Sequence, residues 1–242
     1  MRKITINLAA VAAFCIVVAS PALVSSSCAT PQTEQEDTTI IREDLGITAL
    51  KYSSPEVPSS IEFCGKVIDL SRFDRHERMD RELLAFTYMH STSLQMLKKA
   101  NRYFPIVEPI LKENGIPDDF KYLMVIESNM NPTARSSAGA AGLWQFMQGT
   151  GRDYGLEVNN NVDERYHIEK ATRAACRYLK DAYAKYKDWV AVAASYNAGQ
   201  ARIASQLAKQ DVDDSLDLQL VEETARYVYR ILAAKQLFSA PT

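Results

Sequence analysis

The chain has 242 residues, of which 47% are hydrophobic, so one domain with a substantial core can form beside an N-terminal extension. Its 28 basic and 30 acidic residues give a formal net charge of −2, and no block of lysine or arginine occurs. We therefore expect no nucleic-acid partner, because phosphate backbones are bound through clustered positive charge.

The N-terminus has the order of a secretory signal peptide. Arg2 and Lys3 precede an apolar run over residues 4–18, and small residues with Pro21 follow it. The run is short for a bilayer span, so we favour export to the cell envelope over a retained membrane anchor. The predicted signal occupies residues 1–28.

Cysteine positions leave two questions open. Cys28 closes the segment 23–28 and suggests a lipid-modified N-terminus that would attach the protein to a membrane, although Ser25 stands where an aliphatic residue is usual. Plain cleavage is the alternative. An oxidising compartment would allow Cys64 and Cys176 to pair, but Cys176 lies on an apolar helical face, where a buried free thiol is the simpler interpretation. No cysteine or histidine cluster has metal-ligand spacing, and we expect no metal and no cofactor.

The next segments prepare a helical domain. Residues 29–60 are polar, acidic and rich in Thr, Ser and Pro, which is typical of a linker. Residues 61–80 form a lead-in, in which a weak two-residue alternation from Ile61 to Leu70 allows a little strand. From about residue 80 the pattern becomes helical, and we expect the domain to occupy residues 81–238.

The helical segments follow one another with short connections. Apolar residues recur at three- and four-residue steps from Leu83 to Leu97, and a second stretch over 103–113 is expected to break at Pro105 and Pro109. Further helices are predicted over 117–128, 168–186, 189–194 and 222–238. The helix at 189–194 is apolar nearly all round and is therefore expected to be central. The fold class is all-α.

One helix carries the first candidate for chemistry. Pro117 opens it, and Asp118 and Asp119 are expected to satisfy its free N–H groups, while Asn131-Pro132 ends it. Glu127 lies at its C-terminal end, where the partial negative charge of the carbonyls and partial burial should raise the pKa of the carboxyl. A glutamic acid that stays protonated can donate to a glycosidic oxygen. A solvent-exposed glutamate at a helix end is the structural alternative.

Two later segments add groups suited to a sugar cleft. Small residues precede an aromatic and amide cluster over 138–147, where glycines allow close backbone approach and aromatic faces can pack on sugar rings. Residues 195–199 end a buried helix with a tyrosine, an amide and a glycine. Taken alone, each segment is as easily core and capping.

Four segments occur together in one order: Glu127-Ser128, Gly142-Leu143-Trp144-Gln145, Tyr196-Asn197-Ala198-Gly199 and Glu223-Thr224-Ala225-Arg226-Tyr227-Val228. As a set they resemble the motifs of the lytic transglycosylases, most of all the soluble type and the membrane-bound D type, which are relatives of goose-type lysozyme. The similarity covers about residues 80–238. Ser195 stands where alanine is usual and Gln148 where proline is common, and neither change removes a reactive group.

The resemblance implies a lysozyme-like fold and roles for named residues. Glu127 would be the single catalytic acid and base, and Ser128 would help to position the site. The substrate-binding residues would be Gly142, Leu143, Gln145, Tyr196 and Asn197 in the sugar cleft, with Tyr227 close to the acid. The implied substrate is the glycan strand of peptidoglycan, and we expect a monomer.

The resemblance also implies a reaction. Glycoside cleavage usually takes two carboxylates, but Asp153, Asp163 and Glu164, the candidates by position, belong to no matching motif. A single acid favours cleavage between N-acetylmuramic acid and N-acetylglucosamine in which the muramoyl 6-hydroxyl closes a 1,6-anhydro ring. Two alternatives stay open: a hydrolytic muramidase on the same fold, and a non-catalytic peptidoglycan-binding protein.

Overall fold

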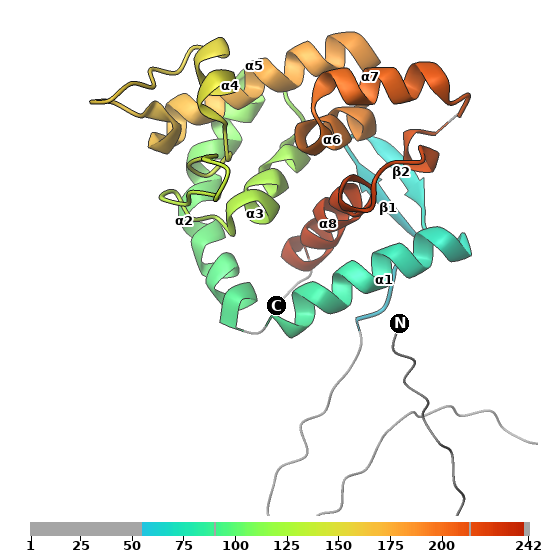
Figure 1. Ribbon diagram of the computed structural model, residues 1–242. Coiled ribbons are helices and arrows are strands. Elements are labelled where there is room, and N and C mark those ends of the chain that lie inside the picture. The colour runs from blue at the N-terminus through green and yellow to red at the C-terminus, as the bar shows by residue number, and fades with distance from the viewer. Residues whose placement is uncertain (1–54, 90, 213, 240–242) are drawn as a thin grey trace, which may run out of the picture. The chain divides into compact units, whose positions relative to one another are not determined.

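The computed structural model describes residues 55–89, 91–212 and 214–239, all within one compact unit that spans Tyr52–Thr242 (Figure 1). The predicted signal peptide, Cys28 and most of the predicted linker lie outside the described residues. The division of the chain at residues 28, 60 and 80 stays a prediction.

A short antiparallel hairpin opens the described chain. Strand β1 (Ser60–Phe63) pairs with β2 (Lys66–Asp69), and Ile61 lies opposite Ile68. The two turn residues, Cys64 and Gly65, have φ values of 53° and 84°, as a tight turn between right-twisted strands requires. The weak alternation over residues 61–70 is thus confirmed as strand.

Helices α1 (Phe73–Tyr88) and α2 (Ser91–Glu113) divide the chain at a different place from the one predicted. The break lies at residues 89–90, whereas Pro105 and Pro109 are both inside α2, so the predicted break at the prolines is wrong. Each proline removes one N–H from the helix, but α2 buries Val107 and Leu111 where it packs along α5. This burial offsets the lost hydrogen bonds, since packing supplies most helical stability in proteins.

The remaining elements are helical and agree closely with the predicted order. They are the 3₁₀ helix η2 (Asp118–Lys121), α3 (Tyr122–Ser128), α4 (Gln148–Asp153), η3 (Glu164–Tyr166), α5 (Ile168–Tyr186), α6 (Trp189–Ala198), α7 (Gln200–Lys209), η4 (Ser215–Asp217) and α8 (Glu222–Ser239). Helix α6 is buried from Val190 to Ser195, which confirms its central place. Within the described ranges the fold is all-α apart from the hairpin, as predicted, and no helix there combines the length and apolar character of a membrane span.

Helix α8 connects the N-terminal and central parts of the domain. It packs against α1, α3, α6 and β1 (Figure 1). Its buried face contains Val228, Ile231 and Leu232, which contribute to the hydrophobic core. This packing brings the last motif of the chain beside α3, the helix that carries Glu127.

Candidate active site

Local contacts fix the helix that carries Glu127. Asp118 and Asp119 do not cap it, so that prediction is wrong: Asp119 accepts the N–H of Cys64 at 2.7 Å and pairs with Lys235 of α8 at 2.8 Å. Asp118 pairs with Lys121 instead. The acids are drawn to nearby donors and cations, and they tie this segment to the hairpin and α8.

Helix α3 also ends earlier than Asn131-Pro132. Asn129 and Met130 have φ values of 49° and 54°, and the left-handed turn closes with N–H groups that donate back to carbonyls of the last helical turn. Asparagine tolerates this conformation better than most residues. The turn leaves Glu127 in the last turn of α3.

Glu127 is half-buried, and its pKa is raised chiefly because burial penalises the charged form. The negative charge of Glu223 raises the pKa further, whereas the hydrogen bond from Tyr227 and the positive charge of Arg230 lower it. Arg230 also donates to the carbonyl of Ile126 at 3.4 Å. The net shift favours a protonated carboxyl, as a general acid requires.

Tyr227 on α8 is the direct partner of that carboxyl. Its hydroxyl donates to Oε1 of Glu127 at 2.5 Å, the length of a strong O–H···O⁻ hydrogen bond. Tyr227 is buried, and both burial and the charge of Glu127 hold its pKa well above the usual value. The phenol therefore stays a hydrogen-bond donor.

Tyr196 and Asn197 lie at the end of α6. The hydroxyl of Tyr196 donates to the carbonyl of Trp144 at 2.8 Å, and the charge of Glu127 adds to burial in raising the pKa of this phenol. Oδ1 of Asn197 accepts a hydrogen bond from Thr224 at 2.9 Å. Because the oxygen is held on that side, the two N–H groups of the amide remain for a ligand.

The segment from Gly142 to Gln145 is a tight loop. Gly142 has a φ of 79°, and Gln145 donates from Nε2 to the carbonyl of Gly142 at 2.8 Å and to that of Ala134 at 3.2 Å. Leu143 is buried and so packs beneath the loop rather than on its surface. Trp144 is fully buried and donates to Thr172 at 2.9 Å, so its ring is core and does not face a sugar.

Ser128 turns its hydroxyl inward. It is buried, and its Oγ donates to the carbonyl of Met124, one turn earlier in the same helix, at 3.0 Å. The hydroxyl proton is therefore used within α3. A contact of Ser128 with substrate would have to use the acceptor side of the same oxygen.

Arg165 organises the loop and belongs to no segment singled out in the sequence. Its buried guanidinium forms two hydrogen bonds with Asp163, at 2.9 and 2.7 Å, and donates to the carbonyls of Gly139 and Phe146 at 2.8 and 3.0 Å. The hydrogen bonds from Arg165 lower the pKa of Asp163. No spacing rule predicts these contacts, because the partners come from a separate loop.

The predicted candidates for a second carboxylate have other partners or lie exposed. Asp163 is bound by Arg165, Glu164 accepts hydrogen bonds from Lys170 and the N–H of Glu157, and Asp153 is exposed on α4. Glu223 was overlooked. It is exposed in the first turn of α8, and its four-residue spacing from Tyr227 is the signal that could have placed it on the same helix face.

The thiols and other metal-binding groups give no further centre. Cys64 and Cys176 are both free, and Cys176 is fully buried, which agrees with the simpler interpretation of that residue. Among the described residues, no group of three or more His, Cys, Asp or Glu is placed to hold a metal ion.

A helical domain that holds one raised-pKa carboxyl beside two tyrosines has the arrangement of a glycoside-cleaving site. Residues 105–217 match the family model described as "Transglycosylase SLT domain". The chain therefore carries a domain of the lytic transglycosylase family.

Individual relatives agree. The chain is 30% identical over 166 residues to the membrane-bound lytic murein transglycosylase D of Escherichia coli strain K12, which is 66% of this chain and 36% of that protein. It is 31% identical over 123 residues to the peptidoglycan transglycosylase gp16 of Escherichia phage T7, covering 49% of this chain and 9% of that protein. It thus spans about a third of the first relative's length.

A solved structure was also found. The lytic transglycosylase Slt of Pseudomonas aeruginosa, solved as an inactive mutant, aligns with a TM-score of 0.48 and 22% identity, over 69% of this chain and 31% of that one.

Proposed function

We propose that this protein is a peptidoglycan lytic transglycosylase. It cleaves the β-1,4 bond between N-acetylmuramic acid and N-acetylglucosamine and forms a 1,6-anhydromuramoyl product. The proposal depends above all on one observation, the half-buried Glu127 that receives the hydrogen bond of Tyr227. The family match and the helical fold support the lysozyme-like architecture that the motifs predict.

The reaction needs one carboxyl in two protonation states. Protonated Glu127 donates to the glycosidic oxygen, and the bond from that oxygen to the muramoyl anomeric carbon breaks. The carboxylate then accepts the proton of the muramoyl 6-hydroxyl as its oxygen bonds to the same carbon. The proton returns to Glu127, no water is consumed, and no cofactor is needed.

Tyr227 suits this exchange because its partner charge changes twice. Its hydroxyl stabilises the carboxylate after the first proton transfer, which keeps the pKa of Glu127 from rising as far as burial alone would drive it. We assign Tyr196, Asn197, Gly142, Leu143, Gln145 and Ser128 to binding the glycan around this carboxyl. For Gly142 and Leu143 that role is the shape and support of the loop.

The hydrolytic alternative would place a water on the other side of the sugar and use a second carboxylate as base. Glu223 is the acid whose charge reaches Glu127, so it is the residue that a muramidase would use. Glu223→Gln should then abolish cleavage if the enzyme hydrolyses. It should leave the anhydro product unchanged in kind if Glu127 acts alone.

The products separate the two reactions directly. Purified peptidoglycan is digested with the protein, and the soluble fragments are analysed by mass spectrometry. The lyase gives 1,6-anhydromuropeptides, which are lighter by one water than the hydrolytic products. Fragments that all end in reducing muramic acid would overturn the proposed reaction, and the absence of any fragments would favour a binding protein.

We also propose that the protein is exported to the cell envelope, where peptidoglycan lies, and is a monomer. The relatives' printed description as membrane-bound supports a membrane-associated form, for which Cys28 is the proposed lipid attachment site. Fractionation of cells that express wild type or Cys28→Ala tests this. Loss of the protein from the membrane fraction in the variant supports the lipid anchor, and unchanged partitioning removes it.

A further inference from the structure

Glu82 is a buried carboxylate that no motif of the sequence includes. It lies in the middle of α1, only 1% of its surface is exposed, and it precedes residues 105–217, which match the family model. Burying a charge is costly unless partners satisfy it. The function of Glu82 should therefore follow from what its two oxygens contact.

Both oxygens bind arginines. Oε1 accepts from Nε of Arg226 at 2.7 Å and from Nε of Arg81 at 3.2 Å, and Oε2 accepts from Nη2 of Arg226 at 3.2 Å. Two bonds from one planar guanidinium fix its direction as well as its distance. A buried ion pair adds little net stability, so the main effect of this contact is on position.

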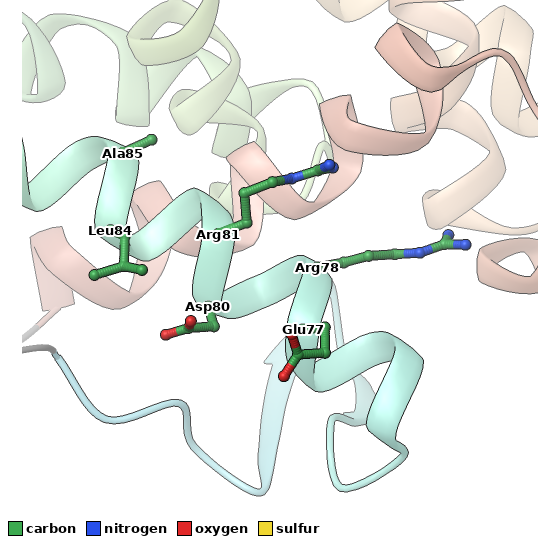
Figure 2. Close-up of a pocket in the computed structure, with 6 residues that line it drawn as sticks. All are labelled: Glu77, Arg78, Asp80, Arg81, Leu84 and Ala85. Atoms are coloured by element: carbon green, nitrogen blue, oxygen red, sulfur yellow. The ribbon is translucent and has the colours of Figure 1, made fainter. Parts of the chain in front are cut away.

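The position that it fixes is that of α8 beside the candidate active site. Arg226 immediately precedes Tyr227, whose hydroxyl binds Glu127. A second bridge runs from Arg81 to Glu222, the first residue of α8, at 2.8 Å. Figure 2 shows that Arg78 and Arg81 extend from one side of α1 and that Glu77 and Asp80 extend from the other.

We propose that Glu82 is a positioning residue for the active site, which acts through Arg226 to hold α8 where Tyr227 meets Glu127. This inference rests on the proposed function, because it assigns Glu82 to the same reaction. It extends the functional unit to α1. Glu82 itself touches no substrate.

A small displacement of α8 would have a chemical effect. At 2.5 Å, the bond from Tyr227 to Glu127 is at the short limit, and a helix shift lengthens it. The other groups that act on Glu127 are Arg230 and Glu223 on α8 and Tyr196 on α6. Since the Tyr227 bond lowers the pKa of Glu127, weakening that bond raises the pKa and leaves a poorer base for the second step.

The test replaces Glu82 by glutamine, which keeps the shape and removes the charge. The pKa of Glu127 is measured in the purified protein by carboxyl ¹³C NMR, with the signal assigned from Glu127→Gln. We expect Glu82→Gln to raise this pKa. On peptidoglycan, we expect kcat to fall roughly tenfold to a hundredfold, with KM changed less than about twofold. The alkaline limb of the pH profile should move to higher pH.

Two matched controls separate positioning from stability. Glu77→Gln makes the same change on the exposed side of α1, and Asp217→Asn breaks an α1 ion pair with Arg75 that reaches η4 rather than α8. Neither should move the pKa of Glu127. If Glu82→Gln does not fold, Arg226→Lys keeps the charge and loses the two-bond geometry, and it should give the same upward shift.

Failure of the two proposals can be told apart. An unchanged pKa of Glu127 and an unchanged kcat in folded Glu82→Gln, or equal shifts in the two controls, would overturn the positioning role. A wild-type protein that releases no anhydromuropeptides would instead overturn the proposed function. The NMR titration reports on positioning even then, because it needs no substrate.

Discussion

The contact between α3 and α8 and the loop of residues 134–166 each hold one carboxylate, and the fold treats the two in opposite ways. Glu127 is half-buried against the neutral phenol of Tyr227, and its pKa is raised. Asp163 is bound at both oxygens by the guanidinium of Arg165, and its pKa is lowered. The partner, not the type of residue, decides which carboxyl can carry a proton.

The difference teaches how to separate chemistry from scaffolding in a chain rich in acids. A carboxylate beside a fixed cation is held ionised, and here that pair fixes loop shape. A carboxyl that lacks such a cation and is shielded from water can exchange a proton near neutral pH. The predictions below test each half of this division.

Glu127→Gln should have the largest effect on activity. The amide cannot donate or accept the proton, so glycan cleavage should fall by roughly 10²- to 10⁴-fold. Release of soluble fragments from peptidoglycan measures the loss. Glu169→Gln, which changes an exposed glutamate on α5, is the control and should retain full activity. Unchanged digestion by Glu127→Gln would refute catalysis by this residue.

The same variant should be more stable at neutral pH. Because the pKa of Glu127 is raised in the folded state, its contribution to stability is fully present below the unfolded value of about 4.5 and is lost as pH rises through the folded value. Glutamine is free of this penalty. We expect Tm to rise by roughly 2–4 °C at pH 7, which corresponds to about 1 kcal/mol, and by less at pH 4.

Gly142→Ala should have the largest effect on the loop. An added Cβ would lie 1.9 Å from the carbonyl oxygen of Arg165, and the φ of 79° is strained for alanine. We expect a loss of roughly 4 kcal/mol or more in the free energy of unfolding, measured by urea titration. Gly139→Ala is the matched control: its φ is 91°, but the added Cβ meets open space. It should cost only about 1–2 kcal/mol.

The fold could be predicted where periodicity is strong. The spacing of alanine and tyrosine places α5 at its observed bounds, and the apolar run from Trp189 identifies the buried α6. The break between α1 and α2 could not be found in this way. The apolar stripe continues across it, and the prolines are a local signal that burial of α2 overrides.

The site could be predicted only in part, for a related reason. Motifs identify residues that face one another across the fold, such as Glu127 and Tyr227, because each motif is local even though the contact is not. Arg165 and Glu82 belong to no motif, and their contacts span 26 and 144 residues of sequence. Long-range ion pairs of this kind leave no periodic trace in one chain.

Asp163→Asn should have a moderate effect that depends on pH. Since the hydrogen bonds of Arg165 lower the pKa of Asp163, the contribution to stability is present above the unfolded value of about 3.8 and is lost as pH falls through the folded value. Removing one partner leaves the buried guanidinium without its anion. We expect roughly 2 kcal/mol of destabilisation at pH 7, less than for a fully buried pair because Asp163 is partly exposed.

The pH dependence of this variant is the sharper observation. The difference between wild type and Asp163→Asn should shrink as pH falls from 7 toward 3, whereas for Glu127→Gln it should shrink over the same range with the opposite sign. Asp153→Asn, at an exposed acid on α4, should change stability little at any pH. A constant deficit of Asp163→Asn down to pH 3 would contradict the assignment of its carboxylate to the Arg165 pair.

Thr224→Val should have the smallest effect, and it tests the boundary between site and scaffold. Thr224 is buried, and its hydroxyl binds Oδ1 of Asn197 at 2.9 Å. Valine has nearly the same shape, so the fold should persist while the amide of Asn197 becomes free to turn. Losing one hydrogen bond of about 1 kcal/mol should raise KM roughly threefold to tenfold and leave kcat nearly unchanged. Thr224→Ser keeps the hydroxyl and should restore KM. If Thr224→Val keeps the wild-type KM, the orientation of Asn197 does not contribute to glycan binding, and its contact with α8 belongs with the scaffold contacts of Asp163.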